Sequence, residues 1–362
     1  MSTLEVSPTG GAAVNAWPEN GTEPVRACPV CGSEAREMVH RGLQDKIFRC
    51  APGNWDLYRC GTCGTGYLDP RPNRATIALA YSRYCTHQSA QGVEQPPRSA
   101  WRRFRTAQRN AYLNATYGYH FSPAGRVPLW LTTNRRQRFD KRIGYLPYPG
   151  KGARVLDVGC GNGCFLMQMR AAGWEVSGVE PDPIAAAAAA AAGINVRTGL
   201  LEPGTQPEKY YDAVTLNHVI EHLHYPVETL RTCRQVLKPG GMIFIATPNF
   251  ASTGHRLFGR DYFPLDPPRH LVLFTAGSLQ AALRTAGFEP EPSVRLRLVG
   301  REWFEGSALI RKGSDPMQKE PPLSLPEKLE AVWRAWRADR ATRSKPELTE
   351  ELVLLGRRPI EA

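Results

Sequence analysis

The stretch that decides the fold is RVLDVGCGNGCFL, residues 154–166, an apolar run that reaches Asp157 and then breaks at Gly159, Gly161 and Gly163. Glycines that directly follow a buried strand let the backbone turn sharply and approach a ligand closely. The pattern therefore predicts a binding loop between a strand and a helix. By itself it is compatible with dinucleotides, nucleoside phosphates and sulfonium cofactors.

Strand-like and helix-like patterns alternate on both sides of this loop. Short apolar runs typical of buried strands are separated by helical patterns, one of which contains eight consecutive alanines, residues 185–192. Such alternation predicts an α/β fold with a doubly wound, Rossmann-like parallel sheet that binds ligands at the carboxyl ends of its strands. Strands are expected at residues 153–159, 175–181, 194–199, 210–220, 242–249, 294–300 and 350–359. Helices are expected at residues 164–174, 183–193, 226–241, 275–288 and 326–343.

Two acidic residues near the loop narrow the choice of cofactor. The glycines have GxGxG spacing, whereas a dinucleotide site has GxGxxG and a helix N-terminus aimed at the pyrophosphate. Asp157 would repel a pyrophosphate but suits the ammonium group of a methionine moiety. Glu180, at the end of the next strand, is placed to accept hydrogen bonds from both hydroxyls of a ribose. Together these residues indicate S-adenosylmethionine.

Six segments of the chain support this cofactor as a set. They are LDVGCGNG (156–163), GVEPD (178–182), YDAV (211–214), NHVIEHL (217–223), VLKPGG (236–241) and TPN (247–249). In this order they resemble the class I S-adenosylmethionine-dependent methyltransferases, particularly the small-molecule branch that includes the ubiquinone-biosynthesis O-methyltransferases. The resemblance extends over roughly residues 150–300.

The resemblance also implies which residues contact the cofactor. They are Gly159, Gly161 and Gly163 in the loop, Glu180 at the ribose, Leu200 and Leu201 at the adenine, and Asn217 and His218 at the methionine end. The chain departs from the family at TGLLEP, residues 198–203, where the family has an acidic residue near the adenine.

Four of the nine cysteines are paired at CxxC spacing near the N-terminus. In CPVCG and CGTCG the glycine after the second cysteine relieves crowding as the backbone turns, so that two thiolates converge on one ion. Cys28, Cys31, Cys60 and Cys63 are predicted to bind zinc in a closed, structural site, with the intervening Cys50 as an alternative ligand. The segment resembles the zinc-ribbon modules of many bacterial methyltransferases from glycan and secondary-metabolite pathways.

Positive charge is concentrated in one part of the chain. Residues 98–142 contain eleven lysines or arginines and one acid, Asp140, interleaved with aromatic residues, whereas the formal net charge of the whole chain is +12. Such a segment can bind nucleic acid, cover an anionic substrate or connect domains through solvated helices. We expect a connector or a lid.

Two histidines are candidates for proton transfer. HVIEH, residues 218–222, matches the HxxEH pattern of zinc peptidases, but its place after a strand of this sheet directs the histidines towards the cofactor or the acceptor. His222 and His270, the latter at the end of the long loop 248–270, suit general-base catalysis near neutral pH. A structural role for each is the alternative.

The predicted organisation is a flexible tail (1–25), a zinc ribbon (26–72), a basic helical connector or lid (73–148), a cofactor-binding core (149–300), and a helical excursion with a final strand (301–362). No run of about 18 apolar residues and no secretory signal occurs, so we expect a cytoplasmic protein without a membrane span. The expected function is methyl transfer to a small, possibly anionic acceptor, such as a hydroxyl of a metabolite or activated sugar. The alternatives are an RNA methyltransferase and a non-catalytic adaptor.

Overall fold

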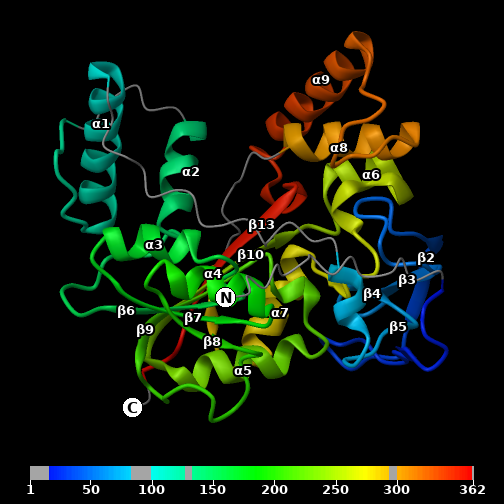
Figure 1. Cartoon of the computed structure of the whole chain (residues 1–362), viewed down its shortest axis with the longest axis horizontal. Coiled ribbons are helices and arrows are strands. Elements are labelled where there is room, and N and C mark those ends of the chain that lie inside the picture. The colour runs from blue at the N-terminus through cyan, green and yellow to red at the C-terminus, as the bar shows by residue number, and fades with distance from the viewer. Residues whose placement is uncertain (1–15, 83–98, 127–132, 293–299, 361–362) are drawn as a thin grey trace, which may run out of the picture.

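A seven-stranded sheet forms the centre of the molecule (Figure 1). The computed structural model describes residues 16–82, 99–126, 133–292 and 300–360. In spatial order the strands are β12 (Glu289–Pro290), β13 (Glu351–Arg357), β10 (Leu237–Pro248), β9 (Tyr211–Asn217), β6 (Arg154–Val158), β7 (Glu175–Glu180) and β8 (Asn195–Thr198). The five strands from β10 to β8 are parallel, as predicted, but β13 runs antiparallel to both neighbours. The sheet is therefore mixed and not purely parallel.

Helices cover both faces of this sheet because its strands bury both sets of alternating side chains. Ile243 and Ile245 of β10 pack on one face with α5 (Pro226–Val236) and α7 (Ala276–Thr285). Phe244, between them, packs on the opposite face with α3 (Cys164–Ala171) and α4 (Pro183–Ala191). This is the doubly wound arrangement that the alternating pattern predicts.

Two element boundaries differ from the prediction for local reasons. The helix expected to reach residue 241 ends at Val236, and β10 begins at Leu237. Pro239 lacks a backbone N–H and disfavours helical geometry in the residue before it, so the chain becomes extended. The strand expected to reach residue 220 ends at Asn217, because His218 adopts a left-handed conformation with φ 56°.

The N-terminal ribbon is joined to the core through a shared sheet. Its strands β2 (Arg36–Leu43), β3 (Trp55–Cys60) and β4 (Gly66–Leu68) pair in sequence, and β4 also pairs with β11 (Val272–Leu273) of the core. Figure 1 shows the ribbon beside the edge of the central domain. Residues 26–72 therefore supply three strands of this four-stranded sheet, and the core supplies the fourth, β11.

Part of the predicted tail is packed against the ribbon. β1 (Thr22–Glu23) pairs with β5 (Arg71–Pro72), and the rings of Trp17 and Trp55 lie 5.1 Å apart, edge to face. The tail prediction is therefore wrong for residues 16–25, while residues 1–15 lie outside the described part of the chain.

The basic segment forms two helices on one side of the sheet (Figure 1), α1 (Ala100–Tyr117) and α2 (Thr133–Arg142). The Tyr112 hydroxyl of α1 donates a hydrogen bond to Asp140 of α2 at 2.9 Å. The first turns of α1 expose Trp101 and Phe104, whereas Leu113 is buried. Residues 83–98 and 127–132 of the predicted connector lie outside the described residues.

The predicted excursion after the core is helical. It contains α8 (Gly300–Lys312) and α9 (Leu325–Ala341), which pack over α6 (Thr253–Phe258) in Figure 1. The strand expected at 294–300 falls almost wholly on residues outside the described part, and Gly300 begins α8. Among the described residues no helix is both long and apolar enough to cross a membrane.

A fully buried arginine connects the ribbon to the long loop. Arg269, 0% exposed, donates hydrogen bonds to both carboxylate oxygens of Asp45 in the ribbon and of Asp266 in the loop. It also donates to the carbonyl of Ala80 at 2.9 Å, and its guanidinium stacks on Phe48. Burial favours the neutral acid at Asp45, but the hydrogen bonds from Arg269 lower the pKa of that carboxyl.

Replacing this arginine should unfold the junction. Arg269→Met removes the cation and leaves two buried carboxylates unpaired, which should lower the unfolding free energy by about 3–5 kcal/mol. Lys46→Met is the matched control, because Lys46 pairs with Asp261 at 2.9 Å on the surface, and its loss should cost at most about 1 kcal/mol. Urea unfolding followed by circular dichroism measures both values, and equal effects would contradict a central role for Arg269.

Candidate functional site

The glycine loop after β6 leaves open space at one position. Gly159, Gly161 and Gly163 all have positive φ, between 53° and 79°. A Cβ at Gly159 would lie 2.5 Å from Val219, and one at Gly163 would lie 3.1 Å from Ala189. A Cβ at Gly161 would have no heavy atom within 4 Å. The first and third glycines thus allow close packing, and the second borders space that a ligand can enter.

Glu180 lies beside that space at the end of β7. Its carboxylate accepts hydrogen bonds from the backbone N–H groups of Gly161 at 2.7 Å and Asp182 at 2.9 Å. Burial raises the pKa of Glu180. Each carboxylate oxygen has further lone pairs, so the side chain can hold the loop and still accept hydrogen bonds from a ligand's hydroxyls.

Asp157 lies deeper, at the end of β6. It is 4% exposed and accepts a hydrogen bond from the Thr215 hydroxyl at 2.5 Å. Burial, with a smaller effect of the nearby Glu180 charge, raises the pKa of Asp157 to about 7. A cation placed nearby would favour its ionised form, which is the behaviour expected of a carboxylate that faces an ammonium group.

The remaining predicted cofactor residues lie at the same edge of the sheet. Leu200 is exposed and Leu201 is buried, just after β8. The Asn217 side-chain oxygen, at the end of β9, is buried and has no hydrogen-bond partner among the described residues. A buried acceptor without a donor is costly, and a ligand that donates a hydrogen bond there would satisfy it.

His218 follows Asn217 and sits between two buried carboxylates. Its Nδ1 lies 3.3 Å from Glu221 and its Nε2 lies 2.8 Å from Glu351. Burial opposes the charged ring, but the hydrogen bonds to Glu221 and Glu351 outweigh it and raise the pKa of His218 to about 9. Both ring nitrogens of His218 thus lie within hydrogen-bond distance of carboxylates, which favours the charged ring.

The two candidate bases lie next to each other. The rings of His222 and His270 are 4.7 Å apart at 68°, although the residues are far apart in sequence. Burial lowers the pKa of His222 to about 4, assisted by the positive charge of His270. The buried Glu221 adjoins both rings. Glu221 is part of HVIEH, but the spacing of that motif alone does not identify it as a site residue.

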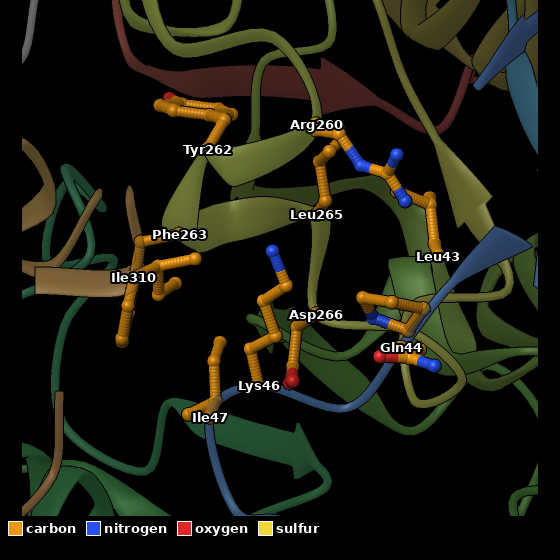
Figure 2. Close-up of a pocket in the computed structure, with 11 residues that line it drawn as sticks. Leu43, Gln44, Lys46, Ile47, Arg260, Tyr262, Phe263, Leu265, Asp266 and Ile310 are labelled. Atoms are coloured by element: carbon orange, nitrogen blue, oxygen red, sulfur yellow. The ribbon is translucent and has the colours of Figure 1, made fainter. Parts of the chain in front are cut away.

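A small pocket beside the long loop is too small for an acceptor (Figure 2). Its walls come from the ribbon residues Leu43, Lys46 and Ile47 and from loop residues that include Tyr262 and Asp266. Its volume is about 20 Å³, which is enough for one water molecule.

The four paired cysteines converge in the ribbon. One sulfur from each lies within 4.8 Å of the other three, and the closest pairs are Cys28 with Cys63 at 3.6 Å and Cys31 with Cys60 at 3.5 Å. A tetrahedral site with zinc–sulfur bonds of about 2.3 Å requires sulfurs about 3.8 Å apart. The donor set and its spacing fit zinc. Cys50 lies elsewhere, with its sulfur 3.3 Å from the carbonyl oxygen of Ala80.

The core is similar to known methyltransferases. Residues 131–292 match the family model of a methyltransferase domain. Ubiquinone biosynthesis O-methyltransferases are similar: the protein from Roseobacter denitrificans is 33% identical over 126 residues, covering 33% of this chain and 50% of the relative. The protein from Caulobacter vibrioides is 38% identical over 122 residues, covering 31% of this chain and 47% of the relative. The chain thus spans about half the length of these curated relatives.

Solved structures are more distant. An S-adenosylmethionine-dependent methyltransferase from Mesorhizobium loti is 20% identical, with a TM-score of 0.41, and the match covers 61% of this chain and 98% of that one. The family model and the curated relatives thus support a methyltransferase domain in residues 131–292.

Removing the charge of Asp157 should change how stability depends on pH. Because the folded pKa is about 7 and the unfolded value is about 4, stability is fully present below pH 4 and is lost as pH rises through 7. Between about pH 5.5 and 8 the wild type should lose about 2 kcal/mol more than Asp157→Asn, which has no proton to lose. Urea unfolding of both proteins without cofactor measures this, and identical pH slopes would contradict it.

The cysteine cluster should bind zinc. Cys60→Ser should contain about one zinc equivalent less per chain than the wild type, because a closed four-thiolate site loses affinity with one ligand. Cys50→Ser is the matched control and should keep its zinc. Elemental analysis of protein purified without added metal tests this, and a wild type that is zinc-free yet folded in the ribbon would refute it.

Proposed function

We propose that the protein transfers a methyl group from S-adenosylmethionine to a hydroxyl of a small molecule. The observation that carries the proposal is the buried Glu180 carboxylate, which accepts a hydrogen bond from the backbone N–H of Gly161. Open space adjoins Gly161, because a Cβ built there would have no neighbouring heavy atom within 4 Å. The match to a methyltransferase domain supports the reaction class. The curated relatives are named O-methyltransferases of ubiquinone biosynthesis, which supports an oxygen acceptor on a small molecule.

The residues at the carboxyl edge of the sheet fit the cofactor. Glu180 would accept hydrogen bonds from the ribose hydroxyls, and Asp157 would face the ammonium group. Asn217 has a buried oxygen that lacks a donor, which suits a polar group at the methionine end. Leu201 and Leu200 would lie against the adenine. When bound, S-adenosylmethionine supplies an activated methyl group on a sulfonium.

The protein's own contribution is positioning and control of one proton. Methyl transfer is an in-line displacement, so holding the acceptor oxygen close and aligned provides most of the acceleration. A hydroxyl acceptor must also lose its proton. His222 and His270 are our candidates for accepting that proton. His222 lies in the turn that follows β9, His270 ends the long loop, and their rings are 4.7 Å apart.

The ribbon would position the loop that carries His270, without contributing a reacting group of its own. Its strand β4 pairs with β11, which begins two residues after His270. Zinc at the four cysteines would hold the ribbon rigid and thereby fix where the loop carrying His270 ends. The zinc would be structural, because four thiolates leave no open coordination position.

Calorimetry with S-adenosylhomocysteine tests the cofactor assignment. Glu180→Ala should weaken binding by about 1.5–3 kcal/mol, the range for hydrogen bonds to a charged group. Glu175→Ala is the matched control, because Glu175 begins the same strand and pairs with Arg154 at the surface, and it should leave the affinity unchanged.

Two results would overturn the proposal. Equal affinity in the wild type and Glu180→Ala would remove the cofactor assignment. Tight RNA binding whose affinity falls with salt, at a log–log slope of about −0.7 per phosphate contact, would favour a nucleic-acid acceptor and a direct role for the basic helices α1 and α2.

A further inference from the structure

Helix α9 buries its small side chains and exposes its large apolar ones. Ala331, Ala335 and Ala338, which face the rest of the protein, are only 2–3% exposed. The solvent side carries four large apolar residues that are 53–71% exposed, namely Leu325, Leu329, Trp333 and Trp336. A surface helix of a monomeric domain normally shows the opposite distribution, with the large apolar side chains towards the core. The outer face of α9 therefore has the composition of a contact surface.

Packing against α8 fixes which side of α9 faces outward. A Cβ at Gly300, the first residue of α8, would lie 3.4 Å from the Cβ of Ala335, so the two helices are in close contact. At the start of α9, Glu327 pairs with Lys312 of α8 at 2.8 Å and accepts a hydrogen bond from the backbone N–H of Ser324. Figure 1 shows α9 at the outside of the molecule, away from the central sheet. The exposed side chains cannot turn inward without breaking these contacts.

Arginines lie against both tryptophans of this face. The guanidinium of Arg337 is 4.7 Å from the ring centroid of Trp333, and that of Arg340 is 5.7 Å from the ring centroid of Trp336. These four side chains line an open groove on the surface. Tryptophan and arginine are among the residue types that contribute most to the binding energy of protein interfaces. Exposed apolar surface with a polar rim is typical of a protein interaction site.

The charges on the outer face match a reversed copy of the same helix. Glu330 and Arg337 are separated by about two helical turns, so they lie on the same flank of the apolar residues. In an antiparallel pair of α9 helices, Glu330 of each copy would lie opposite Arg337 of the other. Leu329 would lie opposite Trp336 in the same register. Both pairs are centred near Trp333, so one arrangement satisfies the charges and the apolar contacts together.

A membrane or a nucleic acid fits this face less well. α9 contains four basic and three acidic residues and is therefore close to neutral, whereas anionic surfaces attract strongly basic segments. The exposed carboxylate of Glu330 would be repelled by phosphate groups. It pairs with Arg334 of its own helix, but its oxygens keep lone pairs that can accept from a second guanidinium.

We propose that two copies of this chain associate through α9 in an antiparallel, two-fold symmetric pair. Both copies use the same face, so each contact between Glu330 and Arg337 occurs twice. Trp333 and Trp336 are removed from water, and the partner's Leu329 packs beside Trp336. Burial of these apolar side chains supplies the affinity, and the two charge pairs determine the direction of the helices.

Light scattering coupled to size-exclusion chromatography of the full chain tests the dimer. At about 50 µM the wild type should have about twice the 40.2 kDa mass of one chain. Trp336→Glu should be monomeric, because it places a carboxylate from each copy in the apolar contact. Trp101→Glu is the matched control, because Trp101 is 63% exposed on α1, and it should remain dimeric.

Charge reversal tests the direction of the helices. Glu330→Arg and Arg337→Glu should each raise the dissociation constant about tenfold or more, because like charges then face each other at two places. The double variant should recover most of the wild-type affinity, because opposite charges face each other again. Sedimentation equilibrium measures the dissociation constants, and circular dichroism checks that each variant keeps its helix content.

The inference fails if the wild type is monomeric at this concentration. It also fails if the dimer survives Trp336→Glu, which would place the contact elsewhere, or if the double charge variant stays as weak as the single ones. A monomer that binds vesicles of anionic lipid, and loses this binding in Trp336→Glu, would assign the face to a membrane. None of these results depends on cofactor binding, because α9 lies beyond residues 131–292, which match the methyltransferase domain.

Discussion

The buried guanidinium of Arg269 is the interaction on which the junction between the ribbon and the long loop depends. It joins Asp45 of the ribbon to Asp266 of the long loop, and all three are almost wholly buried. A buried cation is tolerable only with opposite charges and hydrogen bonds on every side. The ribbon and the loop must therefore meet in one register, since any slip would leave one of these charges uncompensated.

The same residue connects that junction to the candidate site. The side chain of Arg269 holds the ribbon, while its carbonyl accepts a hydrogen bond from His222 and its peptide leads directly into His270. A shift of the ribbon would move the guanidinium, and with it the backbone that orients both imidazoles. The ribbon is thus linked to the two histidines through Arg269, although none of its four clustered cysteines lies in the group of Glu221, His222 and His270.

The sequence predicts those parts of the molecule that depend on local patterns. The parallel core strands and their helices follow from apolar periodicity, and the glycine loop follows from residues 154–166. The antiparallel direction of β13, the pairing of β4 with β11 and the buried Arg269 depend on contacts between distant segments, which no local period encodes. The same holds for the site, because HVIEH is visible in the sequence but its contact with His270 requires the long loop to fold back.

The pairing of β4 with β11 has a consequence for synthesis of the chain. About 200 residues separate the two strands. At a synthesis rate of about 5–20 residues per second, roughly 10–40 s pass between the synthesis of β4 and that of its partner β11. During that time Gly66–Leu68 is an exposed sheet edge, and unpaired edges attract other strands. Its shortness, three residues, limits the backbone it offers to a neighbouring nascent chain.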